Sequence, residues 1–128
     1  MPVAISLDET KDYVLKVECE KNGDPKPSAT VFVLGVMDQI KLASVSILTR
    51  KIAKDDNAFE RYVRDTLRYG LKGWRNFTDK TGRLVTFETD DNGTPTDATL
   101  SKIPATHLIE LAVEIIRYNS MTGQELGN

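Results

Sequence analysis

Residues 30–34 read Thr30-Val31-Phe32-Val33-Leu34, a β-branched and aromatic run that predicts a strand. Upstream, residues 13–20 alternate between apolar and polar side chains, which is the period of a half-buried strand. Between the two runs, residues 22–27 contain Gly23, Pro25 and Pro27, whose backbone preferences interrupt a strand. We therefore expect an N-terminal antiparallel hairpin with a long loop.

A helix is predicted next, from a cap at Asp38 to about Ile52. Its expected apolar face consists of residues at spacings of three, four and one: Ile40, Ala43, Ile47 and Leu48. Other apolar residues widen this arc, and several Ser and Thr residues form helices weakly. Part of the stretch could therefore be a strand instead.

The next predicted helix begins near Asp56 and has a clear apolar stripe. The stripe comprises Phe59, Tyr62, Val63, Thr66, Leu67 and Leu71. We expect Gly70 and Gly73 to end this helix, because glycine adopts the left-handed conformation of helix termini. Residues 76–78 and 83–87 then predict a second, short hairpin around a turn with a positive φ at Gly82.

The C-terminal third predicts an exposed loop followed by a last helix. Residues 88–98 are polar, and Pro104 suits the first turn of a helix that reaches about Ser120. Its apolar residues cover more than half of the circumference and leave a narrow polar strip of Glu110, Glu114 and Arg117. We expect residues 122–128 to fray.

Length and composition place the whole chain, residues 1–128, in one domain with one core. Hydrophobic residues make up 40% and charged residues 28%, an ordinary globular balance. The predicted fold class is α+β, with the N-terminal hairpin, two or three helices and the second hairpin. The chain shows no apolar run of membrane-spanning length and no export signal, so we expect no membrane contact and a cytoplasmic location.

The charges are unevenly distributed along the chain. Residues 50–83 carry ten Lys and Arg against five Asp and Glu, whereas residues 84–128 carry two against seven. Such a two-sided surface favours oriented association with a partner or with another copy of the chain. Charge alone does not identify that partner.

The chain contains few side chains that could form a catalytic or metal-binding site. His107 is the only histidine and Cys19 the only cysteine, so a zinc site of Cys and His within one chain is excluded. A calcium loop aligned on Gly93 would place Thr99 where the bidentate Glu must be, and no phosphate-binding glycine motif is present. We expect no cofactor, no metal and no enzymatic activity.

Arg61, Arg64 and Arg68 recur at spacings of three and four along the second predicted helix, with Arg75 following. Such a basic face could follow a phosphate backbone. The alternative is a solvated or protein-facing surface that Glu60 and Asp65 partly neutralise. We favour the alternative, because the net charge is −2 and the pI about 5.4. Nucleic-acid binding is therefore the weaker hypothesis.

Residues 69–82, with Val85-Thr86-Phe87, resemble a segment of small proteins from phage tail-morphogenesis modules. That segment has the form hydrophobic-x-G-W-x-N-F-x-D-x-x-G followed by a short strand. The opening residues 7–10, the Val31–Leu34 run and the closing Ile-Pro and Leu-Ile-Glu-Leu-Ala sequences are also similar to these proteins. In physical terms the motif is structural, because Trp74 and Phe77 are large anchors and its glycines permit sharp turns.

The resemblance implies a non-enzymatic tail assembly chaperone that binds the tape-measure protein, the tail-tube protein or both until the tube polymerises. A long helical client with exposed apolar stripes would aggregate unless covered. The candidate protein-binding residues are Leu108, Ile109, Ile115, Ile116, Trp74 and Phe77, and plain core packing is the alternative for them. A second hypothesis is a ring-forming connector or tail component that stays in the virion.

Overall fold

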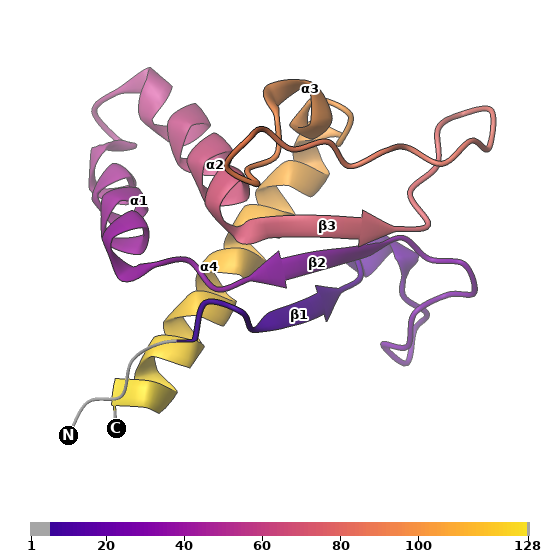
Figure 1. Cartoon of the computed structure of the whole chain (residues 1–128), viewed down its shortest axis with the longest axis horizontal. Helices are drawn as coiled ribbons and strands as arrows, with labels where there is room; N and C mark the ends of the chain where they lie inside the picture. The colour runs from indigo at the N-terminus through magenta and orange to yellow at the C-terminus, as the bar shows by residue number, and fades with distance from the viewer. Residues whose placement is uncertain (1–5, 128) are drawn as a thin grey trace.

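The computed structural model describes residues 6–127, with side chains described as far as Ser120. These residues form a three-stranded antiparallel sheet and helices, so the α+β prediction is confirmed. Figure 1 shows α4 crossing behind the sheet, with α1 and α2 beyond one end of the strands. The elements are β1 (Thr10–Tyr13), the 3-10 helix η1 (Lys16–Glu18), β2 (Val31–Gly35), α1 (Gln39–Lys51), α2 (Asp56–Gly70), β3 (Leu71–Arg75), α3 (Asp97–Leu100) and α4 (Ala105–Gly127).

The predicted N-terminal hairpin exists, but its first strand lies elsewhere. β1 pairs antiparallel with β2 through residues 10–13, and the chain then enters η1 instead of continuing as a strand to residue 20. The turn at η1 buries the side chain of Leu15 in the core. The alternating pattern was therefore misleading, because β2 supplies pairing partners for only the residues before this turn.

The prediction missed the third strand. α2 ends at Gly70, and the chain passes directly into β3, which pairs antiparallel with β2. Gly70 is not in the left-handed region, so the predicted reason for its presence is wrong. A Cβ at Gly70 would lie 2.3 Å from Cγ2 of Ile115, and the glycine thus allows α2 and α4 to approach closely.

The predicted second hairpin is reduced to a single bridge. Thr78 and Leu84 form an isolated antiparallel bridge around a turn, and Gly82 has the expected positive φ of 83°. Similarly, Thr89 bridges Pro95 within the predicted loop, which then leads into α3. Backbone hydrogen bonds flank the first bridge, from Val85 N to the Phe77 carbonyl and from Asp79 N to the Arg83 carbonyl, but the pairing extends no further into a strand in the described residues.

α1 confirms the predicted helix and cap but not the predicted face. The Asp38 carboxylate accepts the Lys41 backbone N–H at 2.9 Å. Val45 and Leu48 are buried, whereas Ile40 and Ile47 are exposed. Because apolar residues lie on two sides of this helix, the sequence pattern could not select the side that packs against α2.

α4 supplies the wall of the core behind the sheet. The Pro104 carbonyl accepts the first helical hydrogen bonds, and the helix continues past the predicted end near Ser120. Asn119 is buried and joins α4 to the end of β2, since its side chain accepts from Met37 N at 2.7 Å and donates to the Gly35 carbonyl at 3.1 Å. The core cluster consists of Leu15, Phe32, Leu34, Met37, Leu67, Leu71, Leu100, Ile103, Leu111 and Ile115.

Candidate protein-binding groove

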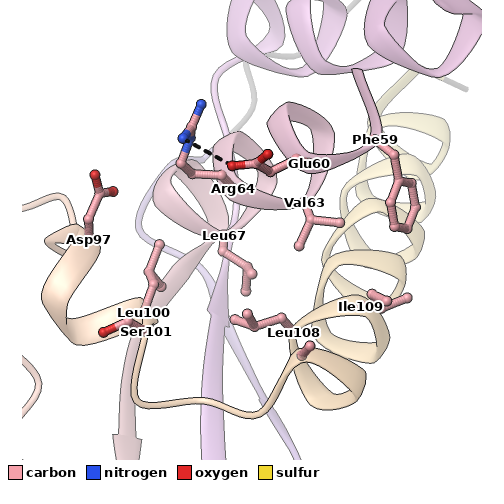
Figure 2. A pocket seen from close by; sticks show the side chains of 11 residues that line it. Phe59, Glu60, Val63, Arg64, Leu67, Asp97, Leu100, Ser101, Leu108 and Ile109 are labelled. Carbon is pink, nitrogen blue, oxygen red and sulfur yellow. Dashed lines mark ion pairs between the residues drawn. The ribbon is translucent and has the colours of Figure 1, made fainter. Parts of the chain in front are cut away.

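An apolar groove lies between α2, α3 and the start of α4. Figure 2 shows the side chains of these three helices around it. The groove has a volume of about 470 Å³ and opens to solvent. We call it the α2–α4 groove. Its lining residues are Phe59, Glu60, Val63, Arg64, Leu67, Asp97, Leu100, Ser101, Ala105, Leu108 and Ile109.

Helical spacing builds the α2 wall. Phe59, Val63 and Leu67 are four residues apart and therefore follow one line along the helix. Their burial increases along this line, from exposed Phe59 through half-buried Val63 to buried Leu67. The wall thus begins as an open surface and ends in the core.

Threonine hydrogen bonds fix the α3 side of the groove. The Thr96 hydroxyl caps α3 by accepting the Thr99 backbone N–H at 3.2 Å. The Thr99 hydroxyl in turn donates to the Glu88 carbonyl at 2.9 Å. α3 is therefore held against the preceding loop, and its buried Leu100 forms part of the groove floor.

Glu110 fixes how α4 is rotated. Its Oε2 accepts the Tyr13 hydroxyl at 2.5 Å and the Lys16 backbone N–H at 3.0 Å. The pKa of the Tyr13 hydroxyl is raised, mainly because the group is partly buried and secondly because it donates a hydrogen bond to Glu110. With Glu110 turned toward β1, the neighbouring Ile109 and Val113 remain exposed.

The predicted polar strip of α4 is only partly solvated, because Arg117 is 60% exposed but the two carboxylates are not. Glu114 is only 6% exposed and pairs with Arg117 at 3.0 Å between Oε1 and Nη1. Glu110 is half-buried beneath Tyr13. The charged residues on this side of the helix predicted a solvated strip, but Tyr13 and Lys16 of the N-terminal segment cover Glu110.

The four predicted contact residues of α4 separate in the structure. Leu108 and Ile109 line the groove, and Ile109 is 40% exposed. Ile116 is half-buried against the core. Ile115 is fully buried beside Gly70, so its prediction as a partner contact was wrong.

Trp74 and Phe77 lie outside the groove, in an aromatic cluster with Phe32 and Phe87. The Trp74 ring centroid is 4.8 Å from that of Phe77 and 4.9 Å from that of Phe87, both in edge-on geometry. Trp74 Nε1 donates to the Val85 carbonyl at 2.7 Å. These contacts use the rings and the indole N–H within the chain, as expected of structural anchors.

Phe77 also borders a second hollow, of about 610 Å³. Charged and hydroxyl side chains share its lining, including Asp79, Lys80 and Lys102. The α2–α4 groove has more apolar side chains and only three charged ones, Glu60, Arg64 and Asp97. It is therefore the better candidate for an apolar partner surface.

The predicted basic face divides between two parts of the molecule. Arg61, Arg64 and Arg68 lie on α2, where Arg64 pairs with Glu60 at 3.7 Å. Arg75 lies on β3 and pairs across the sheet with Asp12 at 2.6 Å. Arg75 is therefore engaged with β1 and does not extend the α2 row.

Among the side chains that the structure describes, no group of three or more His, Cys, Asp and Glu residues could hold a metal ion. Within the same part of the chain, no helix has the length and apolar character to cross a bilayer. Cys19 is half-buried, and its thiol donates to the Leu15 carbonyl at 3.6 Å.

Comparison with known proteins yields no match: no family model, no curated protein and no solved structure is similar to this chain.

The groove residues that the sequence prediction missed include Phe59, Val63, Asp97 and Leu100. Phe59 and Val63 belonged to the predicted apolar stripe of α2, but they were not named as contact residues. The available signal was the length of that stripe, which begins at Phe59 in the first turn of α2 and continues to Leu67 near its end. Asp97 and Leu100 lie at the end of the predicted loop and in α3, where no periodicity marked them.

Proposed function

We propose that this chain is a non-enzymatic tail assembly chaperone of a phage or prophage. In this proposal the α2–α4 groove binds an amphipathic helix of the tape-measure protein or of the tail-tube protein. The observation that carries the proposal is the groove itself, an apolar surface that remains open although the chain has a packed core of its own. The tail-morphogenesis resemblance of residues 69–87 supports the particular clients.

A helix is the client structure that the groove fits best. Two helices, α2 and α4, form its long walls, and exposed Phe59 and Ile109 stand at its opening. A client helix would insert apolar side chains at positions i, i+3 or i+4, and i+7. Burying a large apolar side chain contributes about 1.5–3 kcal/mol, so a few such anchors suffice for specific capture.

Charged groups at the rim give this binding a direction. Glu60 and Arg64 stand on the α2 side, and Asp97 stands at the α3 end, as Figure 2 shows. A client helix with a basic side chain near Asp97 would place opposite charges together. Such rim contacts select the orientation of the client more than they add affinity.

The same groove would also suit a neighbouring subunit in a ring, so a structural virion protein is the second candidate. A connector or tail component would remain in purified particles at fixed stoichiometry. A chaperone would act in the host cytoplasm and be absent from mature particles. Mass spectrometry of purified particles separates these two functions.

The test of the groove is capture of the purified tape-measure protein by this chain. We expect Ile109→Glu to reduce capture at least about tenfold, because it places a charge where the client buries an apolar side chain. Ile109→Leu should retain capture. Val17→Glu is the matched control, since Val17 is 63% exposed and lies outside the groove. Undiminished capture by folded Ile109→Glu would contradict the proposed site.

The nucleic-acid hypothesis has its own experiment. Arg61→Glu, Arg64→Glu and Arg68→Glu together should leave DNA binding unchanged if the α2 row faces solvent or protein. Salt-dependent DNA binding that this charge reversal abolishes would instead favour a nucleic-acid module.

A further inference from the structure

Two hairpin tips share a sequence and a backbone geometry. The first tip (residues 19–25) contains Asn22-Gly23-Asp24-Pro25, and the second tip (residues 89–95) contains Asn92-Gly93-Thr94-Pro95. In each tip an isolated antiparallel bridge joins the residue three before the asparagine to the proline. The glycines have similar positive φ values, 89° in the first tip and 78° in the second. Within these quoted stretches the tips differ only in the residue after the glycine.

An asparagine that precedes a glycine undergoes a slow spontaneous reaction. The glycine backbone nitrogen loses its proton and attacks Cγ of the asparagine side chain. The bond from Cγ to the side-chain nitrogen breaks, and this nitrogen leaves as ammonia with the released proton. Water then opens the cyclic imide and gives either aspartate or isoaspartate. Glycine favours the attack because it has no side chain to obstruct it.

Both tips leave the reacting atoms accessible. The two asparagines are exposed, and a Cβ added at Gly23 or at Gly93 would meet no heavy atom within 4 Å. The glycine N–H donates to the carbonyl three residues before it in both tips, at 2.9 Å in the first and 3.0 Å in the second. Accessibility and this hydrogen bond therefore do not distinguish the two tips.

The asparagine side chains differ in what holds them. Asn22 Oδ1 accepts the Asp24 backbone N–H at 3.0 Å, and Asn22 Nδ2 donates to Asp24 Oδ2 at 3.1 Å. Asn92 donates its backbone N–H to Asp90 Oδ1 at 2.9 Å, but its side chain makes no hydrogen bond with the described part of the chain. Attack requires Cγ to turn toward the glycine nitrogen. Asn22 must break two hydrogen bonds for this rotation, whereas Asn92 breaks none.

We propose that Asn92 is a site of spontaneous covalent modification, where the chain converts to aspartate and isoaspartate well before Asn22 does. Two weak side-chain hydrogen bonds correspond to a difference of at least about fivefold in rate. The charged residues beside the two asparagines also differ, but exposed charges interact weakly in water. This inference does not depend on the proposed function.

The modification changes both the charge and the backbone of the second tip. It places a third carboxylate after Asp90 and Asp91, and isoaspartate inserts one more carbon into the main chain before Gly93. α3 follows this tip directly, and the Thr96 backbone N–H donates to the Glu88 carbonyl at 3.2 Å across it. The reaction therefore alters the loop that holds the α3 side of the α2–α4 groove.

Peptide mass spectrometry of the full chain, incubated at mildly alkaline pH, measures conversion at both asparagines in one sample. In about 1 M NaCl the screening length is about 3 Å, so the different neighbours Lys21 and Asp91 have little influence. We expect Asn92 to convert at least about fivefold faster than Asn22. Equal rates, or a faster reaction at Asn22, would overturn the proposal.

Exchange of the residue after each glycine supplies matched variants. Asp24→Thr removes the carboxylate that holds Asn22 and should accelerate conversion there, while the rate at Asn92 stays the same. Thr94→Asp supplies the equivalent carboxylate to Asn92 and should slow its conversion. Circular dichroism checks that each variant is folded. If Thr94→Asp does not fold, Asp24→Thr alone decides, and an unchanged rate at Asn22 in that variant would overturn the proposal.

Discussion

The aromatic cluster around Trp74 and the groove around Ile109 have similar chemistry but different surroundings. In the cluster, the Trp74 ring packs against neighbouring aromatic rings, and its indole N–H donates to the Val85 carbonyl of the same chain. In the groove, Ile109 and Phe59 each keep a large part of their side chains exposed. The difference teaches that apolar character alone does not define a contact site, because covering by the chain's own residues decides what remains for a partner.

The largest expected effect is on the cluster. Trp74→Ala removes three ring neighbours and one hydrogen bond, and we expect it to lower the free energy of unfolding by about 3 kcal/mol or more. Urea unfolding followed by circular dichroism measures this loss. If Trp74→Ala kept its stability but lost tape-measure capture, the cluster would be a contact site and the comparison would fail.

The next effect concerns Gly70, where the opposite side of α4 meets α2. Gly70→Ala would set a Cβ 2.3 Å from Cγ2 of fully buried Ile115, so we expect a loss of about 1–3 kcal/mol from overpacking. The loss should shrink when Ile115→Ala makes room, which a double-mutant cycle would reveal. Additive effects of the two changes would show that Ile115 is not what requires the glycine.

A smaller effect is expected at the hydrogen bond that orients α4. Tyr13→Phe removes the donor to Glu110, and we expect a loss of about 1–2 kcal/mol near neutral pH. The folded-state pKa of Tyr13 lies above its ordinary value of 10.0. The stabilisation is therefore complete below about pH 10 and is lost as the pH rises further, because the unfolded chain ionises first.

Denaturant midpoints measured across this alkaline range should fall less steeply in Tyr13→Phe than in the unmodified chain. Tyr62→Phe should be measured beside Tyr13→Phe, because burial raises the pKa of Tyr62 as well and this group therefore also contributes to the loss of stability at alkaline pH. An unchanged slope in Tyr13→Phe would contradict the assigned role of this hydroxyl.

The smallest expected effect on stability is in the groove. Ile109→Glu should change the free energy of unfolding by no more than about 0.5 kcal/mol, because its side chain is partly exposed on α4. The same Ile109→Glu variant should nevertheless reduce capture of the tape-measure protein at least about tenfold. Thermal unfolding that showed a strongly destabilised Ile109→Glu would assign Ile109 to the core and remove the contrast with Trp74.

Several local features could be predicted because the residues that cause them are neighbours in the chain. Asp38 caps α1, and Gly82 has a positive φ in a tight turn, as expected from residue type and position. Strand β2 and the stripe of α2 also follow from short patterns. Within the candidate site, Leu108 and Ile109 were predicted for the same reason, since their helix has a wide apolar face.

The errors share a different cause. Residues 71–75 follow a helix directly, and only their pairing with distant β2 makes them a strand. Glu110 looks solvated in the sequence, but Tyr13 from the N-terminal segment packs against it. Neither contact leaves a periodic pattern in the local sequence.

The sequence by itself determined where the three long helices begin and where the Asp38 cap and the Gly82 turn form, because backbone dihedral preferences and capping depend on adjacent residues. Only the tertiary structure decided which apolar faces are covered. It buries Val45 and leaves Ile40 exposed on α1, and it buries Ile115 and leaves Ile109 exposed on α4. The physical reason is that burial depends on contacts between segments far apart in the chain, and residues with the same apolar character can lie on either side of a helix.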